Sequence, residues 1–74
     1  MLSPANIKRI ENEYSKMLGE TVTVQVINET TYIFGTELAC LRAYKKFSAN
    51  KTVECDYSTN LQVWFCSFTP AIYQ

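Results

Sequence analysis

Two carboxylates, Glu54 and Asp56, come closest to a catalytic arrangement in this chain of 74 residues. They lie two positions apart in a segment with strand periodicity, so their side chains share one face. Paired carboxylates can exchange protons with a substrate or bind Mg²⁺. No further motif accompanies this pair, and acidic side chains on a strand are mostly solvated. We therefore expect a solvated strand face here and a protein that is not an enzyme.

The other common kinds of catalytic or cofactor site lack the residues that they need. The chain has no histidine, which removes the usual general base and the commonest transition-metal ligand. Its three cysteines, Cys40, Cys55 and Cys66, are widely spaced without a C-x-x-C pair, so they predict neither a zinc site nor a disulfide framework. Two glycines are too few for a phosphate-binding glycine loop. We expect no cofactor and no metal, and interpret the cysteines as reduced, small apolar residues.

Four basic residues form one charge cluster, Arg42, Lys45, Lys46 and Lys51. A basic helix face can position phosphates, and Trp64, Phe68 or Tyr32, if exposed, can stack on an unpaired base. Lysines near the end of a helix also complement its dipole and keep a protein soluble. The net charge is zero, which removes any general attraction to nucleic acid. Binding of nucleic acid through this cluster is therefore the alternative hypothesis.

The segment from Leu61 to Phe68 is apolar on both of its alternating sides. The Leu61 side carries Leu61, Val63 and Phe65, and the Trp64 side carries Gln62, Trp64, Cys66 and Phe68. A shift of one residue in the register moves every side chain to the opposite face. The loop that precedes this segment therefore decides which side is buried.

Two loop lengths give the two registers. A loop of three residues, Ser58 to Asn60 with Asn60 left-handed, buries the Leu61 side and turns Trp64 and Phe68 outward beside the acidic pair. A loop of two residues, Thr59 and Asn60, buries the Trp64 side instead. We favour the loop of three residues, because the shorter turn lacks its usual glycine.

Either register exposes large apolar side chains if only one face of the sheet is covered. Such a patch is typical of a contact site for a protein, ligand or nucleic acid. In a different arrangement the C-terminal segment "TPAIYQ" folds back and covers the patch with Ile72 and Tyr73. Trp64 would then be a core residue.

Periodicity and capping residues predict the elements that position these side chains. Ser3 and Pro4 are typical of a helix start, Gly19 of a helix end and Thr36 of a second helix cap. The expected elements are a helix over residues 4–18, strands over 21–27 and 31–35, a helix over 37–50, and strands over 52–58 and 61–68.

Both expected helices are amphipathic. The first has a buried face of Ile7, Ile10, Tyr14, Met17 and Leu18, and a charged face of Lys8, Arg9, Glu11, Glu13 and Lys16 that we interpret as solvated surface. The second has a broad apolar face of Leu38, Cys40, Leu41, Ala43, Tyr44 and Phe47.

The order α-β-β-α-β-β predicts a two-layer α+β fold. Two helices on one face of a mainly antiparallel, four-stranded sheet bury these apolar faces most simply. We expect residues 1–74 to form a single compact domain, because the hydrophobic fraction of 47% is that of a globular chain. Its apolar runs are too short for a membrane span and no signal peptide is evident, so a cytoplasmic location without membrane contact is expected.

The leading functional hypothesis is a non-enzymatic protein-interaction module. Its partner is another protein or a second copy of the chain, as a homodimer, since small domains are often stabilised by association. The expected contact residues are Trp64, Phe68, Gln62, Glu54 and Asp56. A short chain without motifs is also typical of accessory or inhibitor proteins from phages and mobile elements.

Overall fold

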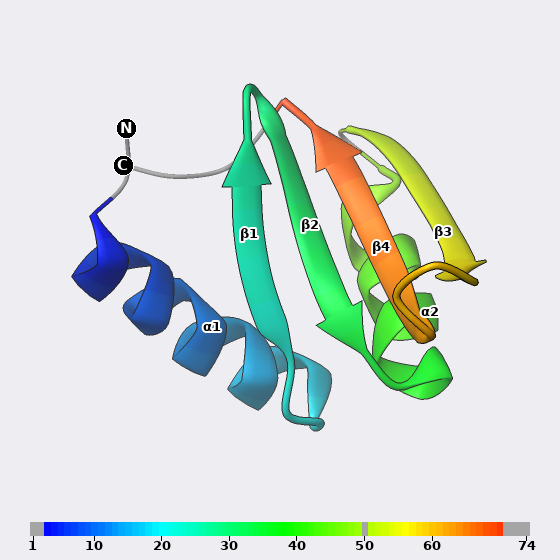
Figure 1. The fold of residues 1–74 in the computed structure, drawn as a ribbon, viewed down its shortest axis with the longest axis horizontal. Coiled ribbons are helices and arrows are strands. Elements are labelled where there is room, and N and C mark those ends of the chain that lie inside the picture. The colour runs from blue at the N-terminus through cyan, green and yellow to red at the C-terminus, as the bar shows by residue number, and fades with distance from the viewer. Residues whose placement is uncertain (1–2, 50, 71–74) are drawn as a thin grey trace.

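The computed structural model describes residues 3–49 and 51–70. The elements are α1 (Pro4–Leu18), β1 (Thr23–Ile27), β2 (Thr30–Gly35), α2 (Glu37–Phe47), β3 (Thr52–Ser58) and β4 (Val63–Thr69). The strands form one sheet in the order β1-β2-β4-β3, and each neighbouring pair is antiparallel (Figure 1). The predicted α+β arrangement is confirmed, and the two hairpins join within one chain through β2 and β4.

The predicted caps account for the helix ends. The Ser3 hydroxyl accepts a hydrogen bond from the Asn6 amide, and α1 stops at Gly19, whose φ of 76° is left-handed. The Thr36 hydroxyl accepts from the Ala39 amide at 3.1 Å and begins α2. That helix ends at Phe47, with Ser48 as its cap. The helix expected over residues 37–50 is therefore shorter than predicted, and Asn50 itself lies outside the described residues. No helix in the described part of the chain has the length and apolar character needed to cross a membrane.

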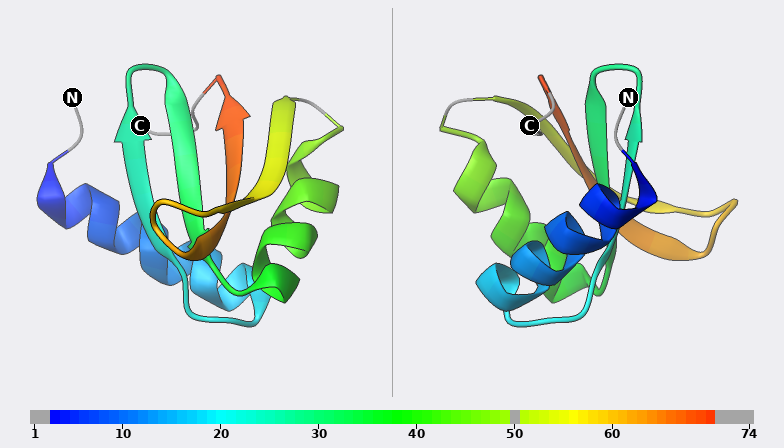
Figure 2. Two further views of the ribbon diagram at one scale, coloured as in Figure 1. Left: turned by 45° about the vertical axis from the view of Figure 1, so that its right-hand side comes forward. Right: turned by 90° about the vertical axis from the view of Figure 1, so that its left-hand side faces the viewer.

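Both helices lie on the same side of the sheet, and the opposite side carries no helix (Figure 2). The core between the layers is centred on Phe68, which is completely buried. Its ring stacks on Phe47 with centroids 4.4 Å apart, and Tyr14 of α1 packs against both rings. We call the side away from the helices the open face; it faces the viewer in Figure 1.

Helix α2 packs through its smallest residues. Ala39, Cys40 and Ala43 are fully buried, whereas Leu38 and Leu41 are each 47% exposed and Tyr44 is 43% exposed. The prediction that Leu38, Leu41 and Tyr44 belong to the buried face is therefore wrong. Small side chains allow the helix axis to approach the sheet closely, and this turns the larger residues to the sides. Met17 of α1, also predicted to be buried, is 37% exposed.

Helix α1 lies along the outer edge of β1. The Glu11 carboxylate accepts a hydrogen bond from the Val24 amide at 2.9 Å, and the Ser15 hydroxyl accepts from the Val22 amide at 3.0 Å. These are main-chain groups that an edge strand would otherwise leave unpaired. Glu11 is thus not simply part of a solvated helix face, as its spacing predicts, but closes this edge of the sheet.

Candidate functional site

The register of the β3–β4 hairpin decides which aromatic residues are available for contact. Ser58 pairs with Val63, so the loop has four residues, 59–62, and Gln62 rather than Asn60 adopts the left-handed conformation, with φ 56°. The predicted loop of three residues is wrong. Hairpin loops of four residues are usually built around a type I turn, which does not need glycine. The Ser58 hydroxyl supports the turn by accepting from the Leu61 amide at 3.2 Å.

This register turns Trp64 and Phe68 toward the helices. Phe68 lies opposite Val53 and is fully buried, while Trp64 lies opposite Tyr57 and is half-buried. The Trp64 and Tyr57 rings meet edge to face, with centroids 5.6 Å apart. The predicted outward orientation of Trp64 and Phe68 is therefore wrong, because a loop with an even number of residues places them with Val53, Cys55 and Tyr57. Whether Ile72 and Tyr73 cover any part of the sheet lies outside the described residues.

The remaining predicted contact residues are exposed but separated from those two aromatics. Glu54 and Asp56 point to the open face from edge strand β3, and Gln62 lies in the hairpin loop. The Asp56 carboxylate accepts from the Tyr57 amide at 2.7 Å. The structure thus brings Glu54 and Asp56 together and separates them from Trp64 and Phe68 by the thickness of the sheet.

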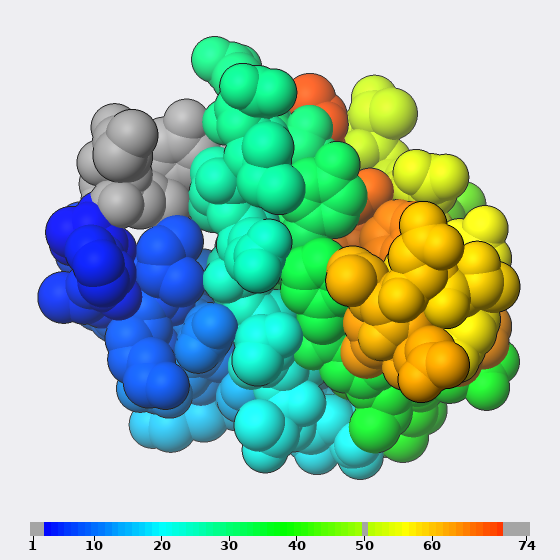
Figure 3. Space-filling view, in the orientation of Figure 1, coloured from blue at the N-terminus to red at the C-terminus, as the bar shows by residue number. Residues whose placement is uncertain are grey.

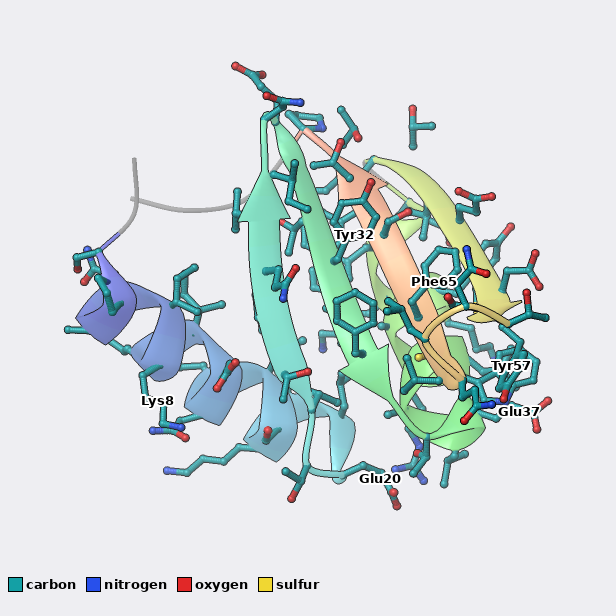
Figure 4. The ribbon with its side chains drawn as sticks, viewed as in Figure 1. Lys8, Glu20, Tyr32, Glu37, Tyr57 and Phe65 are labelled. Carbon is teal, nitrogen blue, oxygen red and sulfur yellow. The ribbon has the colours of Figure 1, made fainter. Side chains whose placement is uncertain are left out.

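The open face has an aromatic cluster of its own, contributed by β2 and β4. Tyr32 and Phe34 stack nearly parallel, with ring centroids 6.2 Å apart and an interplanar angle of 10°. The Phe65 ring is tilted against Tyr32 at 6.4 Å. Figure 4 shows Tyr32 and Phe65 on the near side of the sheet. All three rings are half-buried although no helix lies over them, because they shield one another.

A hollow of about 260 Å³ lies on this cluster. Its lining is mainly apolar and consists of Gln25, Ile27, Tyr32, Phe34, Ser58, Leu61 and Phe65. The end of the β3–β4 hairpin curls forward from the sheet (Figure 2), and Ser58 and Leu61 of this hairpin form part of the lining. In the space-filling view this hairpin stands beside the flatter surface of β1 and β2 (Figure 3). We call these seven residues the aromatic hollow.

None of the five predicted contact residues lines the aromatic hollow. Ile27 and Leu61 are 52% and 63% exposed, so they extend the apolar surface beside the three rings. The signal was present in "TYIFG", because Tyr32 and Phe34 alternate with the equally apolar Ile33. A strand that is apolar on both sides predicts either two covered faces or an exposed patch.

The basic cluster is partly engaged in contacts within the chain. The Arg42 guanidinium donates to the Leu18 carbonyl at 2.7 Å, where it satisfies the end of α1. The Lys51 ammonium lies 5.9 Å from the centroid of the Phe68 ring. Lys45 and Lys46 are exposed in the last turn of α2. Binding of nucleic acid through these four residues stays a prediction, with Arg42 already engaged in holding the two helices together.

The cysteines lie on the helix side of the sheet rather than in the hollow. Cys55 and Cys66 are direct cross-strand neighbours, and Cys40 of α2 is fully buried above the sheet. Burial raises the pKa of Cys40 to about 11 and that of Cys66 to about 12, and it also raises the pKa of Cys55. Reactive cysteines have a lowered pKa. These thiols are therefore neutral at physiological pH and suited to packing rather than to nucleophilic chemistry.

Few polar side chains lie around the hollow. Gln25 and Ser58 supply the polar groups of its lining, and Glu54 and Asp56 lie farther out on the edge strand. Within residues 3–49 and 51–70, no three acidic, cysteine or histidine side chains gather as metal ligands would. Comparison with known protein families, with curated proteins and with solved structures found no match to this chain.

Proposed function

We propose that the protein is a non-enzymatic interaction module that binds a partner protein through the open face of its sheet. The observation that carries the proposal is the aromatic hollow, in which large apolar side chains converge on the side of the sheet that neither helix covers. Contiguous apolar patches on a soluble domain usually mark contact sites. Aromatic residues beside a polar rim are also what the energetic centres of protein interfaces contain.

A protein partner fits the hollow better than a small molecule. Sites for small ligands usually enclose about 300–1,000 Å³ and bury most of the ligand surface. The hollow holds about 260 Å³ and opens onto the surface of the sheet. Its few polar groups also provide little to orient a small ligand. A side chain from a partner, which is held in place by the rest of an interface, needs less enclosure.

Site-specific photo-cross-linking tests this proposal. A photoreactive amino acid replaces Phe65 in the hollow, and in a matched control it replaces Leu41, an exposed apolar residue on α2. In the cell that produces the protein, we expect position 65 to cross-link to a defined protein and position 41 not to do so. The same cross-link should weaken strongly when Tyr32→Ala is added, while circular dichroism shows an unchanged fold.

Two outcomes would overturn the proposal. One is the absence of a cross-linked protein at position 65, and the other is equal cross-linking from positions 41 and 65. A product that contains only two copies of this chain would identify the surface as a homodimer contact instead of a site for a foreign partner. Light scattering of the purified protein would then show a dimer that Phe65→Ala dissociates.

A further inference from the structure

The sheet has two edge strands, and their outer edges differ. Along β1, side chains of α1 accept hydrogen bonds from the Val22 and Val24 amides. Along β3, the Tyr57 amide donates to the carboxylate of its neighbour Asp56, so this amide points away from β4. In an antiparallel ladder every second residue points the same way. The main-chain groups of Val53 and Cys55 therefore also face outward.

Nothing in the described part of the chain pairs with the outward groups of Val53 and Cys55. Hydrogen bonds to the edge from side chains or loops within residues 3–49 and 51–70 are confined to the Asp56–Tyr57 contact. An edge strand of seven residues with free main-chain groups is a template for another extended chain. The β3 edge is therefore able to bind a further strand.

The side chains of β3 disfavour a second copy of the chain as that strand. If two β3 strands pair antiparallel about Cys55, Glu54 of one copy lies directly opposite Asp56 of the other. Pairing about Glu54 or about Asp56 places two identical carboxylates opposite each other. Like charges at directly opposed positions destabilise a strand pair. Charge repulsion therefore disfavours a homodimer through this edge in the registers centred on Glu54, Cys55 or Asp56.

The same carboxylates favour a basic segment. Glu54 and Asp56 are both exposed, and they are the charged residues that the four strands present on the open face. Their side chains lie two residues apart on one strand, about 7 Å along it. A paired strand places its own alternate residues opposite them. Lysine or arginine at two such positions would complement the charge, and the residue between them would face the helix side, near Val53 and Cys55.

We propose that the outer edge of β3 binds an extended segment of a partner protein in which two basic residues flank one apolar residue. Main-chain hydrogen bonds to Val53 and Cys55 supply the affinity, and the pairs with Glu54 and Asp56 supply register and rate of association. This proposal rests on the proposed function, because it describes how the partner on the open face is also held at the sheet edge.

Titration with a synthetic peptide tests the proposal. The probe is a capped peptide of alternating lysine and valine, compared with a peptide of alternating glutamate and valine and with the lysine peptide N-methylated on its backbone. In two-dimensional NMR spectra of the full chain, we expect the lysine peptide to shift the Val53 and Cys55 amides and to protect them from hydrogen exchange. Neither control peptide should do so, and added salt should weaken the binding.

A double variant, Glu54→Gln with Asp56→Asn, removes both charges and keeps the shapes of the side chains. It retains an amide oxygen that can accept from the Tyr57 amide. Because two exposed ion pairs together contribute little, we expect the lysine peptide to bind about twofold to thirtyfold more weakly. The matched control Glu13→Gln, on the exposed face of α1, should bind as the wild type does.

Three results would overturn the proposal: unchanged Val53 and Cys55 amides, equal binding of the N-methylated peptide, or equal binding by the double variant. The cross-linking experiment separates this failure from that of the proposed function. Cross-links from position 65 without peptide binding at β3 would remove only the edge proposal. Peptide binding at β3 without a cross-link from position 65 would remove the open face as the partner site.

Discussion

Strand β4 carries phenylalanines on both of its faces, and the two lie in different environments. Phe68 is fully buried and touches the rings of Phe47 and Tyr14, which come from the two helices. Phe65, three residues earlier, is half-buried, and its ring is tilted against that of Tyr32 on the neighbouring strand. The difference shows that residue type alone does not decide burial. The layer of helices on one side of the sheet decides it.

Substitution of these two phenylalanines gives the largest expected contrast. Phe68→Ala should lower the free energy of unfolding by about 3–5 kcal/mol, because it leaves a cavity between the sheet and both helices. Phe65→Ala should cost less than about 1 kcal/mol, since no layer covers that ring. Chemical denaturation measures both values. If Phe68→Ala does not fold, Phe68→Leu retains much of the buried apolar area, and its loss should still exceed that of Phe65→Ala. Equal losses would contradict the assignment of the two faces.

A substitution at the contact between α1 and the edge strand β1 should have an intermediate effect on the free energy of unfolding. Glu11→Ala removes the acceptor of the Val24 amide, and hydrogen bonds to charged groups contribute about 1.5–3 kcal/mol. Glu13→Ala on the same helix breaks only an exposed ion pair with Arg9 and should cost about 0.2–0.5 kcal/mol. Urea denaturation compares the two. Hydrogen exchange at Val24 should accelerate in Glu11→Ala alone, and an unchanged rate there would show that α1 does not protect this edge.

Mildly alkaline pH should have the smallest effect on the free energy of unfolding. This effect comes from groups on the helix side of the sheet. The folded pKa of Cys40 is about 11 and that of Cys66 about 12, both above the ordinary value of 9.0 because the thiols are buried. The unfolded chain therefore releases these protons first. The stability that these two thiols contribute is fully present well below about pH 9 and is lost as the pH rises through the folded pKa values. The urea midpoint should decrease slightly between about pH 8 and about pH 9.

A variant with Cys40→Ala and Cys66→Ala is the control for this pH dependence. It should show a smaller decrease, although not a flat profile, because burial also raises the pKa of Cys55 and that of Tyr14. A decrease of the same size as in the wild type would mean that the two thiols are not the groups responsible. Phe65→Ala on the open face should leave the pH profile unchanged.

Elements with a local signal were predictable from the sequence. Ser3, Gly19 and Thr36 mark helix ends because each satisfies main-chain groups within a few residues. The expected strand over 21–27 alternates Val22 and Val24 with polar residues, and both valines are buried. The register of the last strand was not predictable in this way, since Trp64 and Phe65 are both large and apolar. Either register would bury aromatic residues, and the loop residues have no glycine to distinguish them.

In the candidate site too, some features followed from local sequence patterns and others depended on the tertiary structure. The acidic pair on the open face followed from alternation within β3, and so did the expectation that apolar residues of β4 stay exposed. Tyr32 and Phe34 join Phe65 only because β2 lies beside β4 in the sheet order, which sequence patterns do not specify. The contact of Glu11 with the edge of β1 likewise spans 13 positions of the chain, beyond the reach of local periodicity.

The sequence by itself determined the number and type of the elements, the caps and the two-layer class, because these depend on spacing and on hydrogen bonds between near neighbours. Only the tertiary structure decided which side of β4 meets the helices, which edge α1 closes and which aromatics form the hollow. Those choices depend on how four strands and two helices fill space together. Small residues such as Ala39 and Ala43 bring α2 against one face, and the other face keeps its aromatic residues on the surface.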